Sequence, residues 1–105
     1  MQAIDPADLE AQTGGDAELA REVLDLFAGQ CRAILPRLLD PAGPRDRRAD
    51  LAHTLKGSAA GVGAGRVRAL ADAAERDLRS GGPVALDALA DAVAAALAEI
   101  AVARA

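Results

Sequence analysis

The spacing of apolar residues limits the possible folds of this chain more than any other feature of its sequence. Leucine, valine, isoleucine and alanine recur at spacings of three and four residues in four long segments, and no segment shows sustained alternation of apolar and polar residues. Spacings of three and four place side chains on one face of a helix, whereas alternation is typical of a half-buried strand. Clusters of glycine and proline separate the segments. The sequence therefore predicts an all-α protein.

Local signals give the expected limits of the helices. A short helix is expected at 7–12, with Asp5 as its N-cap and Pro6 at its first position. Asp16 can cap a long second helix that ends at about Leu39, and Pro36 should kink or break it because proline removes one backbone hydrogen bond. Three further helices are expected. The third spans about 44–61, and the fourth lies between the glycine-rich turns at 61–65 and 80–82. The fifth starts at Pro83 and frays over 101–105.

The length and composition set the architecture of these helices. A chain of 105 residues fits one domain with a single core. Phe27 is the only aromatic residue, so the core must consist of Leu, Val, Ile and many Ala, which allow close helix packing. We expect residues 1–105 to form an antiparallel up-and-down four-helix bundle, with the short additional N-terminal helix covering one end.

The composition disfavours several classes of function. A net charge of −4 and the absence of Trp and Tyr disfavour nucleic acid as a partner. With Cys31 as the only cysteine and one histidine, the chain cannot form an internal disulfide or assemble a zinc site. The first residues lack a signal sequence, and charges interrupt every apolar run, so we expect a soluble cytoplasmic protein that does not bind membranes.

The only histidine, His53, lies in the middle of the third expected helix. The side of this helix predicted to face the core carries Leu51, Leu55, Ala59 and Val62. The side predicted to face water carries Asp46, Ala49, Asp50, His53, Lys56, Gly57 and Ala60. Because helical side chains lean towards the N-terminus, residues 56 and 57 lie over the imidazole. Lys56 brings a cation there, and Gly57 leaves the space open.

The choice of glycine at position 57 needs an explanation, because the chain uses alanine freely elsewhere. Glycine in a helix interior costs roughly 0.5–1 kcal/mol relative to alanine. An exposed ring nitrogen, a nearby ammonium group and an uncovered surface suit a residue that accepts and passes on a phosphoryl group. On spacing alone, a satisfied core histidine or an idle surface histidine is the alternative.

A family resemblance supports phosphoryl transfer. The segment His53-Thr54-Leu55-Lys56-Gly57-Ser58-Ala59, followed by Gly63-Ala64 and Ala73-Ala74-Glu75, resembles the H-x-L-K-G-S signature of histidine-containing phosphotransfer (Hpt) domains. The resemblance implies a four-helix bundle that relays phosphate between aspartates of response-regulator receiver domains. It implies that His53 is the phosphoacceptor at Nε2, that Lys56 stabilises the phosphoryl oxygens, and that Gly57 keeps access open.

The expected partners follow from the same resemblance. They are receiver domains and also a hybrid sensor histidine kinase, and the chain is expected to act as a monomer. Mg²⁺ is expected on the partner receiver domain, because this chain shows no acidic cluster arranged for the ion and no ATP site. The chain should therefore carry phosphohistidine without a cofactor of its own and without autokinase activity.

The partner surface is expected on the exposed side of the third helix, together with the first and second helices. Its predicted apolar centre consists of Ile4, Ala49 and Ala60. Asp50, one turn before His53, is predicted to contribute to this surface, either as a solvated carboxylate or as the hydrogen-bond acceptor for the histidine Nδ1.

Other features leave alternatives open. The cluster Arg45, Arg47 and Arg48 is either a solvated basic face or a contact for an acidic receiver. A non-catalytic helical protein-interaction module is an alternative function for the whole chain. A second alternative is the dimerisation and phosphoacceptor segment of a sensor kinase, in which an acidic residue usually follows the histidine, whereas Thr54 follows here.

Overall fold

A computed structural model describes residues 2–104 of the chain. This part of the chain contains helices α1 (Pro6–Thr13), α2 (Ala17–Leu39), α3 (Arg45–Val62), α4 (Gly65–Ser80) and α5 (Asp87–Arg104), and no strand. The prediction of an all-α protein is confirmed. None of the helices described combines the length and the apolar character needed to cross a membrane.

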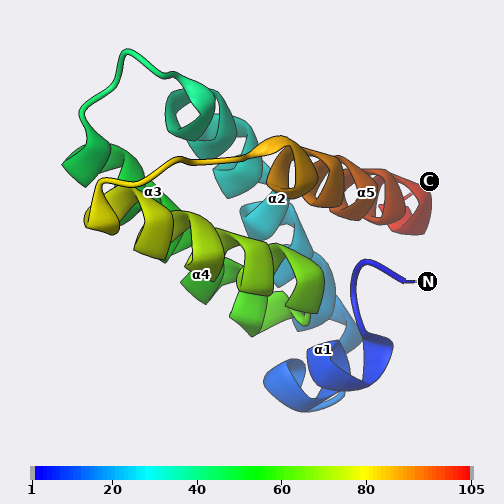
Figure 1. The fold of residues 1–105 in the computed structure, drawn as a ribbon. Helices are drawn as coiled ribbons and strands as arrows, with labels where there is room; N and C mark the ends of the chain where they lie inside the picture. Colours follow the sequence, from blue (N-terminus) through cyan, green and yellow to red (C-terminus); the bar gives the residue numbers. More distant parts are fainter. Residues whose placement is uncertain (1, 105) are drawn as a thin grey trace.

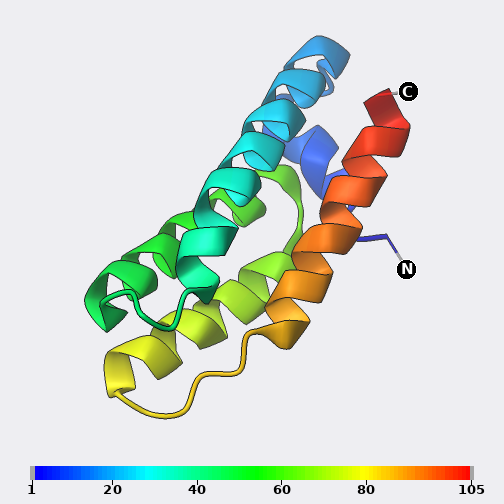
Figure 2. The same ribbon diagram turned by 90° about the horizontal axis from the view of Figure 1, so that it is seen from above.

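The four long helices form an elongated bundle, and the described chain as a whole measures about 41 × 23 × 23 Å (Figure 1). α3 packs against α2 and α4, and α5 closes the bundle by packing against the same two helices (Figure 2). α1 lies across one end and contacts α2 and α3. The predicted up-and-down four-helix bundle with a short N-terminal helix is therefore confirmed. The most extensive contact between helices joins α3 to α4.

Small side chains allow α3 and α4 to approach closely. Ala49 and Ala52 of α3 and Ala71 and Ala74 of α4 are all buried. The prediction that Ala49 faces water is wrong, since none of its surface is exposed. α3 is covered by α2 on one side and by α4 on the other, so its buried arc is wider than the single stripe predicted from the sequence.

The predicted N-caps of the first two helices are present. Asp5 Oδ1 accepts a hydrogen bond of 2.9 Å from the backbone N–H of Ala7. Asp16 Oδ1 accepts hydrogen bonds from the N–H groups of Glu18 and Leu19, at 3.0 and 3.1 Å. Each cap satisfies backbone donors that the first helical turn leaves unpaired, and such caps contribute about 1 kcal/mol each.

α2 ends at Leu39 as predicted, and it continues through Pro36 without a break, because Ile34 and Leu38 on either side are buried and hold both turns in the core. The predicted start of the fifth helix is wrong. α5 begins at Asp87 rather than at Pro83. Residues 83–86 are non-helical and belong to the connection 81–86, which carries the chain from the end of α4 to the start of α5 (Figure 2).

Two of the clustered arginines have structural roles that neither sequence interpretation anticipated. Arg48 is buried, and its Nε donates a 2.9 Å hydrogen bond to the carbonyl of Leu38 at the end of α2. The Arg45 guanidinium donates to the carbonyls of Asp77 and Leu78 in the last turn of α4 and to the carbonyl of Gly82 just after it. Both side chains thus bond carbonyl groups near the C-terminal end of a neighbouring helix, where the helix itself supplies no backbone donor. Arg47 is exposed, as expected.

The N-terminal segment is fixed at both of its ends. Its backbone N–H groups at Ala3 and Ile4 donate to the two carboxylate oxygens of Glu99 on α5, at 2.7 and 2.8 Å. The N–H of Asp5 donates to the carbonyl of Gly63 at 2.9 Å. These bonds draw Ile4 into the core, where only 8% of it is exposed. The prediction that Ile4 lies on an exposed partner surface is therefore wrong.

Candidate functional site

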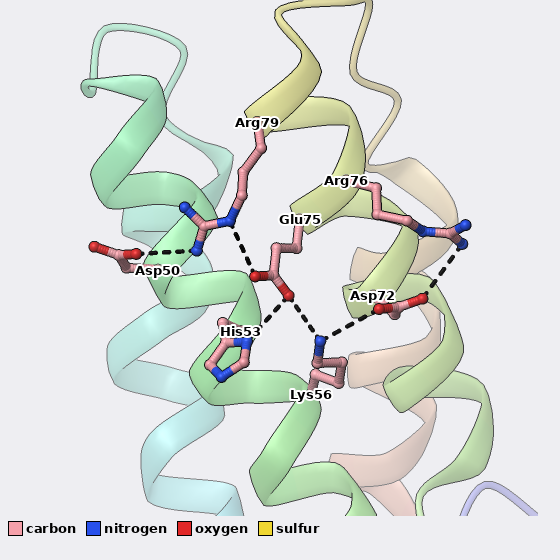
Figure 3. A network of polar contacts seen from close by, with 7 residues as sticks. All are labelled: Asp50, His53, Lys56, Asp72, Glu75, Arg76 and Arg79. Atoms are coloured by element: carbon pink, nitrogen blue, oxygen red, sulfur yellow. Dashed lines mark hydrogen bonds and ion pairs between the residues drawn. The ribbon is translucent and has the colours of Figure 1, made fainter.

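His53 lies on α3 beside α4, and 64% of its side chain is exposed (Figure 3). The predicted exposure of this histidine is therefore confirmed. Its Nδ1 lies 3.1 Å from Oε1 of Glu75, which projects from α4. The second ring nitrogen, Nε2, points away from Glu75 and has no hydrogen-bond partner among residues 2–104 (Figure 3). One edge of the ring is thus held by the protein, and the other is open.

Glu75 is the centre of the polar network around this histidine. Only 12% of its side chain is exposed, and Oε1 accepts a 2.8 Å hydrogen bond from Nζ of Lys56. Its Oε2 accepts a 3.1 Å hydrogen bond from Nε of Arg79. The hydrogen bond from Lys56, with smaller contributions from His53 and Arg79, lowers the pKa of Glu75 to about 2 against an opposing effect of desolvation.

The ionised Glu75 carboxylate determines where the proton of the imidazole lies. A carboxylate without a proton can only accept hydrogen bonds. Neutral His53 must therefore carry its proton on Nδ1 in order to bond Oε1 of Glu75. Its Nε2 then has a free lone pair and faces open space. This arrangement makes Nε2 the available nucleophile.

Lys56 lies one turn after His53 and is held by α4. Its Nζ contacts Oε1 of Glu75 at 2.8 Å and Oδ1 of Asp72 at 3.3 Å, and 26% of its side chain is exposed. The hydrogen bond to Glu75 is the largest of several effects that raise the pKa of Lys56. The ammonium therefore remains charged beside the imidazole, although it points towards α4 rather than towards Nε2 (Figure 3).

Asp50 does not bond the imidazole. Its exposed carboxylate accepts a 3.1 Å hydrogen bond from Nη2 of Arg79, and this bond is the main cause of the raised pKa of Arg79. The suggestion that Asp50 holds Nδ1 of His53 is wrong, because Glu75 occupies that position. Asp50 is exposed as predicted, but it is paired with an arginine rather than only solvated.

Gly57 is exposed, and a Cβ atom added to it would meet no other atom within 4 Å. The missing side chain of Gly57 therefore does not serve the close packing of a neighbouring helix. Ala60, almost one turn further on, is exposed as predicted. On the turns of α3 that follow His53, the exposed positions Gly57 and Ala60 therefore carry no large side chain.

A small apolar hollow lies between α2 and α3. It has a volume of about 220 Å³ and is lined by Val23, Leu26, Phe27, Gln30, Ser58, Gly61 and Val62. Leu26, which lines this hollow, is 69% exposed. Gly61 follows His53 by eight residues on the same helix, which corresponds to about 12 Å along its axis.

Sequence reasoning assigned no role to the α4 half of the site, although Glu75 belongs to the segment Ala73-Ala74-Glu75 that contributed to the family resemblance. Asp72, Glu75 and Arg79 contribute three of the polar side chains that surround His53 and Lys56 (Figure 3). Their spacing of three and four residues places them on one face of α4, next to its buried stripe. This spacing is visible in the sequence, but the register between α3 and α4 decides which of them meets His53.

Comparison with known proteins identifies the family. The family model for the Hpt domain matches residues 22–103. The chain belongs to the Hpt domain family. The match includes the whole of α3 and α4, which supply the polar network, and only α1 and the first turn of α2 precede it. A role in phosphorelay follows from this membership.

A solved structure supports the same assignment. The crystal structure of the histidine phosphotransferase ShpA from Caulobacter crescentus is similar to this Hpt domain, with a TM-score of 0.78 and 35% sequence identity. The similarity covers 97% of this chain and 90% of the other. The comparison with curated proteins found no significant match.

Proposed function

We propose that this Hpt domain is a phosphorelay intermediate. In this proposal His53 accepts a phosphoryl group from the aspartate of one receiver domain and passes it to another receiver domain. The observation that carries the proposal is the hydrogen bond between Nδ1 of His53 and Glu75, which leaves an unprotonated and exposed Nε2. Membership of the Hpt family is its second support.

The proposed transfer is a nucleophilic displacement at phosphorus. The Nε2 lone pair forms the N–P bond while the P–O bond to the receiver aspartate breaks, and the aspartate leaves with the bonding electron pair. The proton on Nδ1 stays in place, so positive charge develops on the imidazole ring. The Glu75 carboxylate, 3.1 Å from Nδ1, stabilises that charge. In the second transfer, an aspartate oxygen attacks phosphorus and the N–P bond breaks.

Lys56 has the proposed role of neutralising the phosphoryl oxygens. Its flexible side chain is held by Asp72 and Glu75 before transfer, and it can exchange the longer bond, to Asp72, for a phosphoryl oxygen. Gly57 is proposed to leave room for the receiver to approach Nε2. Mg²⁺ is proposed to belong to the receiver, and this chain to contribute no metal ligand.

The proposed receiver surface differs from the sequence prediction. Since Ala49 and Ile4 are buried, the apolar centre is proposed to consist of Ala60 and Leu26, with the hollow between α2 and α3 beside them. Asp50 lies at the polar edge of this surface. We further propose that the domain acts as a monomer in the cytoplasm, a reducing compartment with which the single, buried Cys31 is compatible.

A panel of phosphorylated receiver domains tests the proposal. Incubation with the parent protein should move the label to this chain, and a second, unlabelled receiver should then remove it. The label should be stable in base and labile in acid, as expected for phosphohistidine. His53→Gln should accept no label and keep a melting temperature close to the parent value, because the residue is exposed. Receiver binding without any label transfer would favour the non-catalytic interaction module instead.

A further inference from the structure

Arg79 connects the two helices that form the site. Its Nη2 donates to Oδ1 of Asp50 on α3, and its Nε donates to Oε2 of Glu75 on α4, both at 3.1 Å (Figure 3). A guanidinium group is planar, and its N–H donors have fixed directions relative to each other. The two bonds together therefore fix the position of the Arg79 head group between the helices.

The orientation of the Glu75 carboxylate determines which of its two oxygens faces Nδ1 of His53. Arg79 occupies Oε2, and this leaves Oε1 to face both Nδ1 of His53 and Nζ of Lys56. The last torsion of a glutamate side chain is soft, so one bonded oxygen does not fix the plane of the carboxylate. Lys56 bonds only Oε1, so this bond alone leaves the carboxylate plane free to rotate. The bond from Arg79 to the second oxygen supplies the missing constraint.

We propose that Arg79, itself held by Asp50, is a positioning residue that keeps Oε1 of Glu75 on Nδ1 of His53. By this route Arg79 and Asp50 maintain the tautomer in which Nε2 is unprotonated, although neither residue touches the imidazole. The functional importance of this tautomer rests on the proposed function, in which Nε2 is the phosphoacceptor. Asp50 is thus assigned an indirect role, which differs from both alternatives given by the sequence, a solvated carboxylate and a direct bond to Nδ1 of His53.

Arg76 provides a matched control. It lies on the same helix three residues before Arg79, and its only ion pair within residues 2–104 is with Asp72, at 3.3 Å. Both arginines are substantially exposed, so neither variant should disturb the core. Arg76→Gln and Arg79→Gln remove the same charge from the same region of α4. Only the second substitution removes a donor to Glu75.

The tautomer of His53 is the direct measurement. The ¹⁵N chemical shifts of the two ring nitrogens, recorded on the full chain at a pH where the ring is neutral, report which of them carries the proton. We expect the Nδ1–H form in the parent and in Arg76→Gln. Arg79→Gln should increase the ratio of Nε2–H to Nδ1–H several-fold, and Asp50→Asn should change it in the same direction by less. A parent-like ratio in Arg79→Gln would overturn the proposal.

A double-mutant cycle separates this role from a direct contact with the receiver. Arg79→Gln should slow phosphoryl transfer several-fold in the parent and have no further effect in Glu75→Gln, because the positioned group is already altered. The same loss in both backgrounds would mean that Arg79 acts on the receiver and would overturn the proposal. If the parent accepts no phosphate at all, the proposed function fails, while the tautomer measurement still decides the positioning role.

Discussion

Glu75 Oε1 lies 3.1 Å from Nδ1 of His53 and 2.8 Å from Nζ of Lys56, so one carboxylate oxygen contacts both of these motif side chains. The histidine and lysine come from α3, whereas the carboxylate comes from α4. The site is therefore a product of the packing between two helices. The motif on α3 is only half of it.

The shared carboxylate predicts a pH dependence of stability. The pKa of Glu75 falls from 4.5 to about 2 on folding, chiefly because of the hydrogen bond from Lys56. A carboxylate with a lowered pKa in the folded state stabilises the fold above its unfolded pKa, and this stabilisation is lost as the pH falls through the folded pKa. We expect the stability of the parent to fall between about pH 4.5 and pH 2 more steeply than that of Glu75→Gln. Denaturant titrations across this range provide the measurement, and parallel curves would contradict it.

Lys56→Ala should slow phosphoryl transfer without abolishing it. In the proposed reaction the ammonium neutralises charge but forms no covalent bond, and it is more mobile than a rigid oxyanion donor, so we expect a loss of roughly tenfold. Single-turnover transfer from a phosphorylated receiver measures this rate. A variant as fast as the parent would show that Lys56 stays with Asp72 and Glu75 during the reaction.

Gly57 and Gly63 should respond in opposite ways to alanine. A Cβ on Gly57 meets open space, so Gly57→Ala should gain roughly 0.5–1 kcal/mol of stability, or about 2–8 °C in melting temperature. Gly63 has a φ of +76°, and its Cβ would lie 2.9 Å from the carbonyl oxygen of Asp5. Gly63→Ala should therefore lose at least about 1–2 kcal/mol. Thermal melts of both variants decide the matter.

Larger side chains at position 57 should reduce phosphoryl transfer without unfolding the protein. Gly57→Ala should still transfer phosphate, whereas Gly57→Leu and Gly57→Gln should stay folded and lose most transfer. A longer side chain leans back over His53 and keeps the receiver aspartate from reaching Nε2. The same melts, combined with a transfer assay, test this ordering. A large fall in the melting temperature of Gly57→Ala would contradict the access role of the glycine.

The proposed receiver surface predicts a difference between two exposed apolar residues. Leu26 lies on α2 next to the hollow beside α3, whereas Val102, 77% exposed, lies on α5. Leu26→Ser should weaken binding of a receiver by roughly fivefold, or about 1 kcal/mol, and Val102→Ser should leave it unchanged. Titration calorimetry with one receiver provides the comparison. The reverse order of effects would place the receiver on α5.

Local signals in the sequence were sufficient for most of the fold. The spacing of apolar residues predicted the helices, and Asp5 and Asp16 form the caps that their positions indicated. The errors arose where tertiary contacts override local preference. Pro83 can start a helix, yet the chain first has to cross from α4 to α5. Ala49 is buried because two helices rather than one cover α3.

The site was predictable only in part for the same reason. His53, Lys56 and Gly57 are neighbours on one helix, so helical periodicity places them together from the sequence alone. Glu75 lies 22 residues from His53, and no local rule gives the register between the two helices. Asp50 is close to the histidine along the sequence, but the packing of α4 directs its carboxylate to Arg79.

The ¹⁵N spectrum of His53, recorded after incubation of the labelled protein with a phosphorylated receiver domain, tests phosphoryl transfer to Nε2 directly. We expect a nitrogen–phosphorus coupling at Nε2, while Nδ1 keeps its proton and its bond to Glu75. Phosphate on Nδ1, phosphate on any other residue, or no phosphate on the chain would contradict this expectation.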